Sequence, residues 1–123
     1  MSIAKTPLVN HRKGDNMVDL FLILVAAHFV CDYPLQGDFL AKAKNRFAAI
    51  PGVPFYQALG AHAVIHGAAV GLITGFIWLA AAEAVLHALI DDAKCAGRLS
   101  FNQDQLLHFV CKGVWVAVVF ALV

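Results

Sequence analysis

The chain has 123 residues, of which 61% are hydrophobic and 14% are charged, and its formal net charge is +1 at pH 7. Ordinary globular domains are roughly 45–50% apolar and about 25% charged, so this composition excludes a typical water-soluble domain and predicts an integral membrane protein. The small net charge also excludes nucleic acid as a partner, because phosphate binding requires clustered Lys and Arg.

The N-terminal region divides into a polar part and an apolar part. Residues 1–16 are polar and contain Pro7 and Gly14, which predicts a flexible tail. Met17 is an alternative start, because the apolar pattern begins there. Residues 17–33 form the first apolar segment, which Pro34 ends because proline cannot continue a helix. This segment is predicted to be the first transmembrane helix, although roughly 20 residues are usual for a span.

Residues 35–53 have a different pattern, with apolar and basic side chains on separate sides. Phe39, Ala43 and Phe47 fall on one helical face, whereas Lys42, Lys44 and Arg46 fall elsewhere. This pattern predicts a short amphipathic helix at the membrane surface.

The remainder of the chain supplies three further apolar segments. Residues 54–94 would be about 60 Å long as one helix, twice the ~30 Å hydrocarbon core, so they must fold back near Thr74–Gly75. This gives helices at 54–73 and 76–94, and the last helix covers 102–123. The expected fold class is an all-α membrane protein, an antiparallel bundle of four transmembrane helices in one domain, 17–123.

Two further patterns concern packing and orientation. Gly67, Gly71 and Gly75 recur every fourth residue, a spacing that lets helices approach closely and that also suggests a contact surface for a homo-oligomer. The alternative is that glycine is simply common in membrane helices. The loops at 35–53 and 94–100 carry five basic residues against three in the tail. The positive-inside rule therefore places these loops in the cytoplasm, as in a multi-pass protein of a bacterial inner membrane.

The most informative pattern is a set of polar pairs inside the apolar segments. Each pair is spaced i, i+4 and shares one helix face. In an up-and-down bundle all four pairs fall in the same leaflet; they are His28/Asp32, His62/His66, His87/Asp91 and Asp104/His108.

Two charges lie deeper than the pairs. Glu83 is eight residues before Asp91, and Lys112 is eight residues after Asp104, so both lie about 12 Å further in. An isolated charge at such a depth costs about 2.5–3.5 kcal/mol on the insertion scale. Glu83 and Lys112 are therefore predicted to pair with each other, which makes Glu83 a structural partner rather than a metal ligand.

Imidazole and carboxylate together are ligands for divalent metal ions, zinc first and manganese or iron as alternatives. The four pairs supply eight predicted ligands, enough for one crowded ion or for two ions that activate water. The alternative is a metal-free hydrogen-bond or proton-relay network.

At these residues the chain resembles a family of small bacterial and phage membrane proteins, domain of unknown function 3307. The matching stretches are H-F-V-C-D-Y-P-L-Q-G-D-F-L-A-K-A-K at 28–44, H-A-V-I-H at 62–66, L-H-A-L-I-D-D-A-K at 86–94 and D-Q-L-L-H at 104–108. The resemblance implies a polytopic membrane protein and no particular activity. Gln36, Asp38, Lys42 and Gln105 lie within these motifs and either line the mouth of the site or serve as loop and cap residues.

Three functions fit the sequence. The first is a membrane-embedded, metal-dependent hydrolase that acts on a head group or phosphoester. The second is transport or sensing of a divalent ion or proton, since ionisable residues in membranes often mark ion pathways. The third is a non-enzymatic accessory protein that binds a partner.

Overall fold

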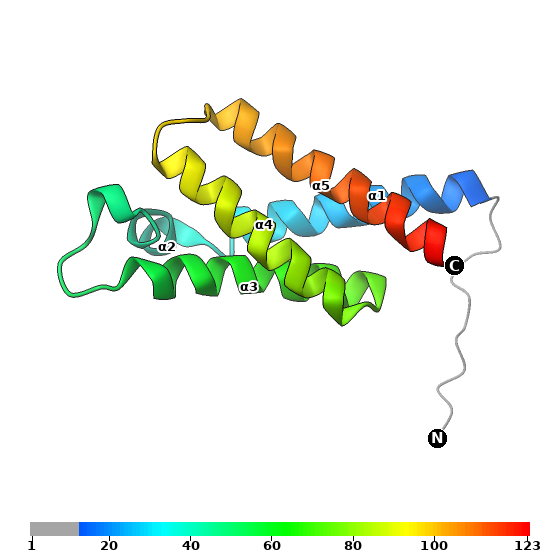
Figure 1. The fold of residues 1–123 in the computed structure, drawn as a ribbon, viewed down its shortest axis with the longest axis horizontal. Coiled ribbons are helices and arrows are strands. Elements are labelled where there is room, and N and C mark those ends of the chain that lie inside the picture. The colour runs from blue at the N-terminus through cyan, green and yellow to red at the C-terminus, as the bar shows by residue number, and fades with distance from the viewer. Residues whose placement is uncertain (1–12) are drawn as a thin grey trace, which may run out of the picture.

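The computed structural model describes residues 13–123, and every regular element in this part of the chain is a helix (Figure 1). This confirms the all-α prediction. The elements are α1 (Lys13–Asp32), α2 (Gly37–Ala43), the 3-10 helix η1 (Arg46–Ala48), α3 (Phe55–Thr74), α4 (Ile77–Cys95) and α5 (Phe101–Leu122).

The four long helices α1, α3, α4 and α5 form a bundle in which consecutive long helices run in opposite directions (Figure 1). The segment with α2 and η1 lies at the same end of the bundle as the α4–α5 loop. The α3–α4 turn lies at the other end. This arrangement brings the C-terminal ends of α1 and α4 to the N-terminal ends of α3 and α5.

Local sequence features set the helix ends. Pro34 follows the last residue of α1 closely and cannot donate a backbone hydrogen bond. Gly75 ends α3 with φ of 78°, a left-handed conformation that favours glycine, and its N–H donates to Gly71 O at 2.9 Å. Ser100 caps α5 in a capping box with Gln103. These signals produce the short turns on which the antiparallel order depends.

The glycines of α3 serve contacts within the chain. A Cβ atom on Gly67 would lie 2.4 Å from the backbone oxygen of Ala80, and one on Gly71 would lie 2.8 Å from Ala80 Cβ. Gly67 and Gly71 thus allow α3 and α4 to approach closely, as the spacing predicts. Gly75 differs, because a Cβ there would meet nothing within 4 Å and its role is in the turn. Contact between copies of the chain through these glycines stays a prediction, and two of the three positions are already occupied by α4.

The polarity of the bundle is unusual for a protein dissolved in water. The buried residues in the described region include eleven polar or charged side chains and nine hydrophobic ones. Large apolar side chains face outward instead, and Leu72 and Ile77 are 86% and 83% exposed. Soluble proteins rarely bury Lys, Glu or Asp in this way. A hydrophobic core does exist at one end of the bundle. It is formed by Leu24, Val70, Leu79, Trp115 and Val116.

The prediction of four transmembrane helices needs correction. Within residues 13–123, α3 and α5 are long and apolar enough to cross a membrane. A third span would require α1 and α2 to act together across a bend of 85°. Helix α4 does not qualify, because its 19 residues carry four charged side chains. The four long helices exist as predicted. By length and composition, however, only two of them could cross a membrane, or three if α1 and α2 count as one bent span.

The predicted boundaries differ by a few residues. Helix α1 begins at Lys13 rather than Met17, so residues 13–16 are helical and not part of a tail. The rest of the predicted tail, 1–12, lies outside the described residues. The predicted amphipathic helix in 35–53 is two short helices, α2 and η1. Arg46 of η1 is tied to α4 by two hydrogen bonds of 2.9 Å to the Asp92 carboxylate.

Candidate metal centre

The eight histidine and aspartate residues of the four pairs lie together in one cluster inside the bundle. They come from all four long helices, near the end that carries α2 and the α4–α5 loop. Seven of them are at most 3% exposed, whereas Asp32 keeps 13% of its side chain exposed. The helical spacing thus predicts which eight residues gather here, and their role as metal ligands stays a prediction.

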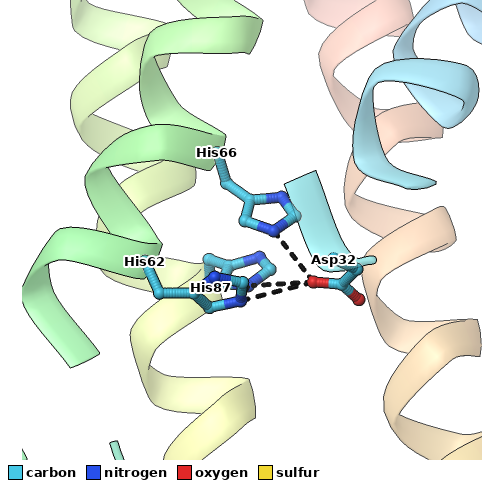
Figure 2. Close-up of side chains that lie close together, drawn as sticks. All are labelled: Asp32, His62, His66 and His87. Atoms are coloured by element: carbon cyan, nitrogen blue, oxygen red, sulfur yellow. Dashed lines mark hydrogen bonds and ion pairs between the residues drawn. The ribbon is translucent and has the colours of Figure 1, made fainter. Parts of the chain in front are cut away.

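The first group in the cluster centres on one oxygen of Asp32. Its Oδ1 atom lies 2.9 Å from His66 Nε2, 3.3 Å from His62 Nε2 and 3.9 Å from His87 Nε2. Figure 2 shows the two histidines on α3, the third on α4, and all three rings directed toward the Asp32 carboxylate. One ligand atom from each of the four residues lies within 4.8 Å of the others. Three separate helices therefore bring one carboxylate and three imidazoles to a common point.

A second group lies on α4 and α5. His108 Nε2 is 3.3 Å from Asp91 Oδ1 and 3.4 Å from Asp104 Oδ1. His87 connects the two groups, because its Nε2 atom is 3.5 Å from Asp91 Oδ2, and it also belongs to a third group with His28 and His108. The cluster is therefore continuous, with two carboxylate-containing groups side by side.

Several buried polar atoms of the cluster lack hydrogen bonds within the described residues. Asp104 Oδ1 is one, and the others are Nδ1 atoms of histidines: His28, His62, His87 and His108. Buried polar groups are normally hydrogen-bonded, so leaving these atoms without a partner costs free energy. Each of these histidines turns its other nitrogen, Nε2, toward the cluster. Two such atoms, of His62 and His87, lie only 3.1 Å apart.

Glu83 lies beneath this cluster and pairs with Lys112, as predicted. Its other oxygen, Oε2, accepts a hydrogen bond from Trp115 Nε1 at 2.6 Å. Glu83 Oε1 also lies 3.6 Å from His87 Nδ1. A carboxylate behind an imidazole commonly orients that ring toward a metal ion, so Glu83 has the position of a supporting residue.

Gln105 connects the outer ends of the cluster. Its amide donates to Asp32 Oδ2 and to Asp104 Oδ2, both at 3.1 Å, and its Oε1 atom is 3.2 Å from His28 Nε2. Gln105 therefore lies within the cluster. The prediction from the family motifs was a place at the mouth of the site or a loop or cap role.

A pocket of about 250 Å³ opens onto the cluster between α2 and the ends of α4 and α5. Asp32, Asp91 and Asp104 reach its wall. Gln36, Asp38 and Gln105 line it as well, whereas Lys42 does not; the basic lining residues are Lys44 and Lys94. Lys44 was expected on the outer surface of an amphipathic helix. It is 8% exposed instead, and its Nζ atom donates to Asp91 Oδ2 at 2.6 Å and to the Gln36 side chain.

The fold and the site define a class: an all-α bundle with a buried His/Asp centre and two helices that could cross a membrane. Residues 20–122 match a family model described as a protein of unknown function, DUF3307. The chain belongs to this family, which confirms the resemblance found in its motifs. No curated protein and no solved structure matches the chain.

Proposed function

We propose that this chain is an integral membrane protein whose His/Asp cluster binds divalent metal ions and supports metal-dependent hydrolysis. The observation that carries the proposal is the convergence of three imidazole Nε2 atoms on Asp32 Oδ1, at 2.9 to 3.9 Å. Three nitrogens and one oxygen are a ligand set that suits zinc, with manganese or iron as alternatives.

The second group adds support for a two-ion centre. Asp91, Asp104 and His108 offer three more ligand atoms, and His87 lies against both groups. Paired ions held about 3.5–4 Å apart activate water and stabilise the charge that develops during hydrolysis. The pocket beside the cluster gives a substrate and water access to the three aspartates. These features together favour hydrolysis over a purely structural metal site, which would be closed.

The polarity of the bundle supports a membrane location. Its large apolar side chains face outward, whereas Glu83, Asp91 and Lys112 are buried inside it, which suits lipid as the surrounding medium. We propose that α1 and α4 enter the bilayer with α3 and α5, because Asp91 and Glu83 of α4 are buried among polar partners. A bacterial inner membrane, with the α2 segment and the α4–α5 loop in the cytoplasm, fits the basic residues there.

Transport is less well supported by the arrangement. A conduit needs polar side chains from one face of the bilayer to the other. The bundle end beyond Glu83 and Lys112 is filled by the apolar core around Leu24, Leu79 and Trp115. The polar cluster is therefore open toward one end only.

Elemental analysis of the detergent-purified protein tests the metal site. We expect one or two zinc, manganese or iron ions per chain in the wild type and a loss of metal in His62→Ala/His66→Ala. His11→Ala is the matched control, since His11 belongs to none of the four pairs. Metal absent from folded wild-type protein that has not met a chelator, even after incubation with zinc, would overturn the proposal and leave a hydrogen-bond network.

Hydrolysis is tested separately on the same samples. Metal-loaded protein should hydrolyse at least one chromogenic substrate among carboxylic esters, phosphomonoesters and phosphodiesters, and chelation should abolish that activity. A loaded protein that is inactive on all of these classes would argue for a metal-binding protein without this activity.

A further inference from the structure

The pocket at the cluster adjoins a second, apolar depression on the outside of the bundle. This groove has a volume of about 410 Å³ and runs between α1 and α5. Its apolar wall includes Phe29, Leu106 and Phe109. The groove and the polar pocket share three lining residues, Tyr33, Phe101 and Gln105. A polar compartment therefore adjoins an apolar one, and the apolar one faces the surroundings of the bundle.

The charge of the polar pocket depends on metal. Four carboxylates line it, from Asp32, Asp38, Asp91 and Asp104, against the two ammonium groups of Lys44 and Lys94, which leaves a formal charge of −2. Two divalent ions would add four positive charges and change the total to +2. The loaded pocket would then attract an anion, whereas the metal-free pocket would repel one.

Both lysines are placed to contact such an anion. Lys44 Nζ lies 2.6 Å from Asp91 Oδ2, and Lys94 Nζ lies 3.8 Å from Asp104 Oδ2. These two carboxylates belong to the second metal group. If their oxygens coordinate ions, the ammonium groups beside them lose these carboxylate partners and can hydrogen-bond to an incoming anion.

Resting on the proposed function, we infer that the substrate is a lipid phosphate monoester. Its phosphate would occupy the pocket beside the cluster, between Lys44 and Lys94, and its acyl chain would lie in the groove of Phe29, Leu106 and Phe109. The pocket, at about 250 Å³, is below the roughly 300–1,000 Å³ typical of drug-sized ligands. That size favours a bare phosphate over a large head group. The exposed groove allows the lipid to enter sideways from the bilayer.

The reaction that follows needs only water. The oxygen of water forms a bond to phosphorus, and the ester P–O bond to the lipid breaks. One proton from water passes to the departing alkoxide, so that the products are inorganic phosphate and a lipid alcohol. Nothing is oxidised or reduced in this step.

The test uses the full-length protein in phosphatidylcholine nanodiscs, with its metal content measured in the same sample. Inorganic phosphate release is followed from phosphatidic acid in the nanodisc and from glycerol 3-phosphate in water. We expect release from the lipid, dependent on metal, and release from the soluble ester lower by on the order of tenfold or more, because the soluble ester cannot fill the groove.

Paired variants separate the two compartments. Lys44→Met and Lys94→Met should each raise the KM for phosphatidic acid on the order of tenfold, the usual effect of losing a charged hydrogen bond. Lys42→Met, which changes the same charge outside the pocket, should leave KM unchanged. Leu106→Trp should fill the groove and slow release from the lipid. Val85→Trp, also on an exposed apolar face of the bundle, should not.

The outcomes distinguish this inference from the proposed function. A protein that holds metal but neither binds phosphatidic acid nor releases phosphate from it overturns the inference and leaves the metal site intact. Equal rates on lipid and soluble ester overturn the role of the groove. A protein without metal overturns both. For any variant, metal content and melting temperature equal to wild type show that a changed KM is not a folding defect.

Discussion

Glu83 shows how single residues make a polar interior tolerable. It is 1% exposed, and its carboxylate contacts Lys112, Trp115 and His87. A buried ion pair often stabilises a protein little, but the removal of one partner leaves a buried charge without compensation. The pair is therefore expected to be sensitive to single substitutions and tolerant of a double one.

We predict that Glu83→Gln and Lys112→Met each lower the free energy of unfolding by about 3–5 kcal/mol. The double variant should lose clearly less than the sum of the two, as measured by denaturant unfolding in detergent. The surface pair of Arg46 and Asp92 is the control, since Arg46→Ala should cost about 1 kcal/mol or less. A double variant that loses as much as the sum of the two single variants would contradict the pairing.

At this scale, spacing predicted which residues gather in the cluster, and depth predicted the ion pair of Glu83 and Lys112. The i, i+4 pattern suffices for the eight cluster residues because helix geometry fixes which side chains share a face. It could not reveal Trp115 as a partner of Glu83, since a tryptophan in an apolar helix has no distinctive pattern. Lys44 was missed for another reason. Its partner Asp91 lies on α4, 47 residues further along the chain, so no local pattern indicates this contact.

At the scale of elements, the contact between α3 and α4 depends on small residues. Gly67 lies against the backbone of Ala80 and the side chain of Ala84, with no room for a methyl group. Helix α3 carries His62 and His66, and α4 carries His87. The close approach of the two helices therefore also sets the distances inside the first group of the cluster. A change at Gly67 should therefore disturb both packing and the site.

We predict that Gly67→Ala lowers the free energy of unfolding by about 1–3 kcal/mol through overpacking. Gly60→Ala is the matched control on the same helix. A Cβ there meets nothing within 4 Å, so the substitution should be neutral or stabilising by up to about 1 kcal/mol. Thermal unfolding of both variants, followed by circular dichroism, makes the comparison. Equal stability of the two would show that the α3–α4 contact is looser than the structure indicates.

The elements themselves were largely predictable, because apolar runs and their breakers mark helices clearly. Pro34, Gly75 and Ser100 each end or begin a helix where local chemistry requires it. The sequence could not show that the amphipathic segment would break into α2 and η1. That break depends on contacts with other elements, such as the Arg46–Asp92 pair with α4.

For the whole molecule, polarity and span composition must be considered together. Helix α4 is too charged to qualify as a span alone, yet Glu83 and Asp91 face the interior. Hydropathy averages over all faces of a helix and cannot distinguish an inward charge from an outward one. The prediction of four spans relied on apolar runs. Helix α4 does not meet the composition of a span because its inward charges are counted together with its apolar outer face. Insertion of the entire bundle is thus a proposal that needs a direct measurement.

Reporter fusions in a bacterial host test the insertion of the last helix, α5. We predict that alkaline phosphatase is active when fused after Val123 and inactive when fused in the α4–α5 loop at Gly97. Green fluorescent protein should give the opposite result at each position. This follows from the antiparallel order of α5 and from the positive-inside rule for the loop. Identical signals from both positions would show that α5 does not cross the membrane.

The long separation between the site residues in sequence has a consequence for synthesis. Asp32 hydrogen-bonds to Gln105, which follows it by 73 residues. At about 5–20 residues per second, the ribosome adds Gln105 on the order of 4–15 seconds after Asp32. His62 and His66, which also contact Asp32, are added earlier in that interval. The group of Asp32, His62, His66 and His87 can therefore assemble before α5 is made, whereas the contacts that Gln105 and His108 supply complete the cluster last.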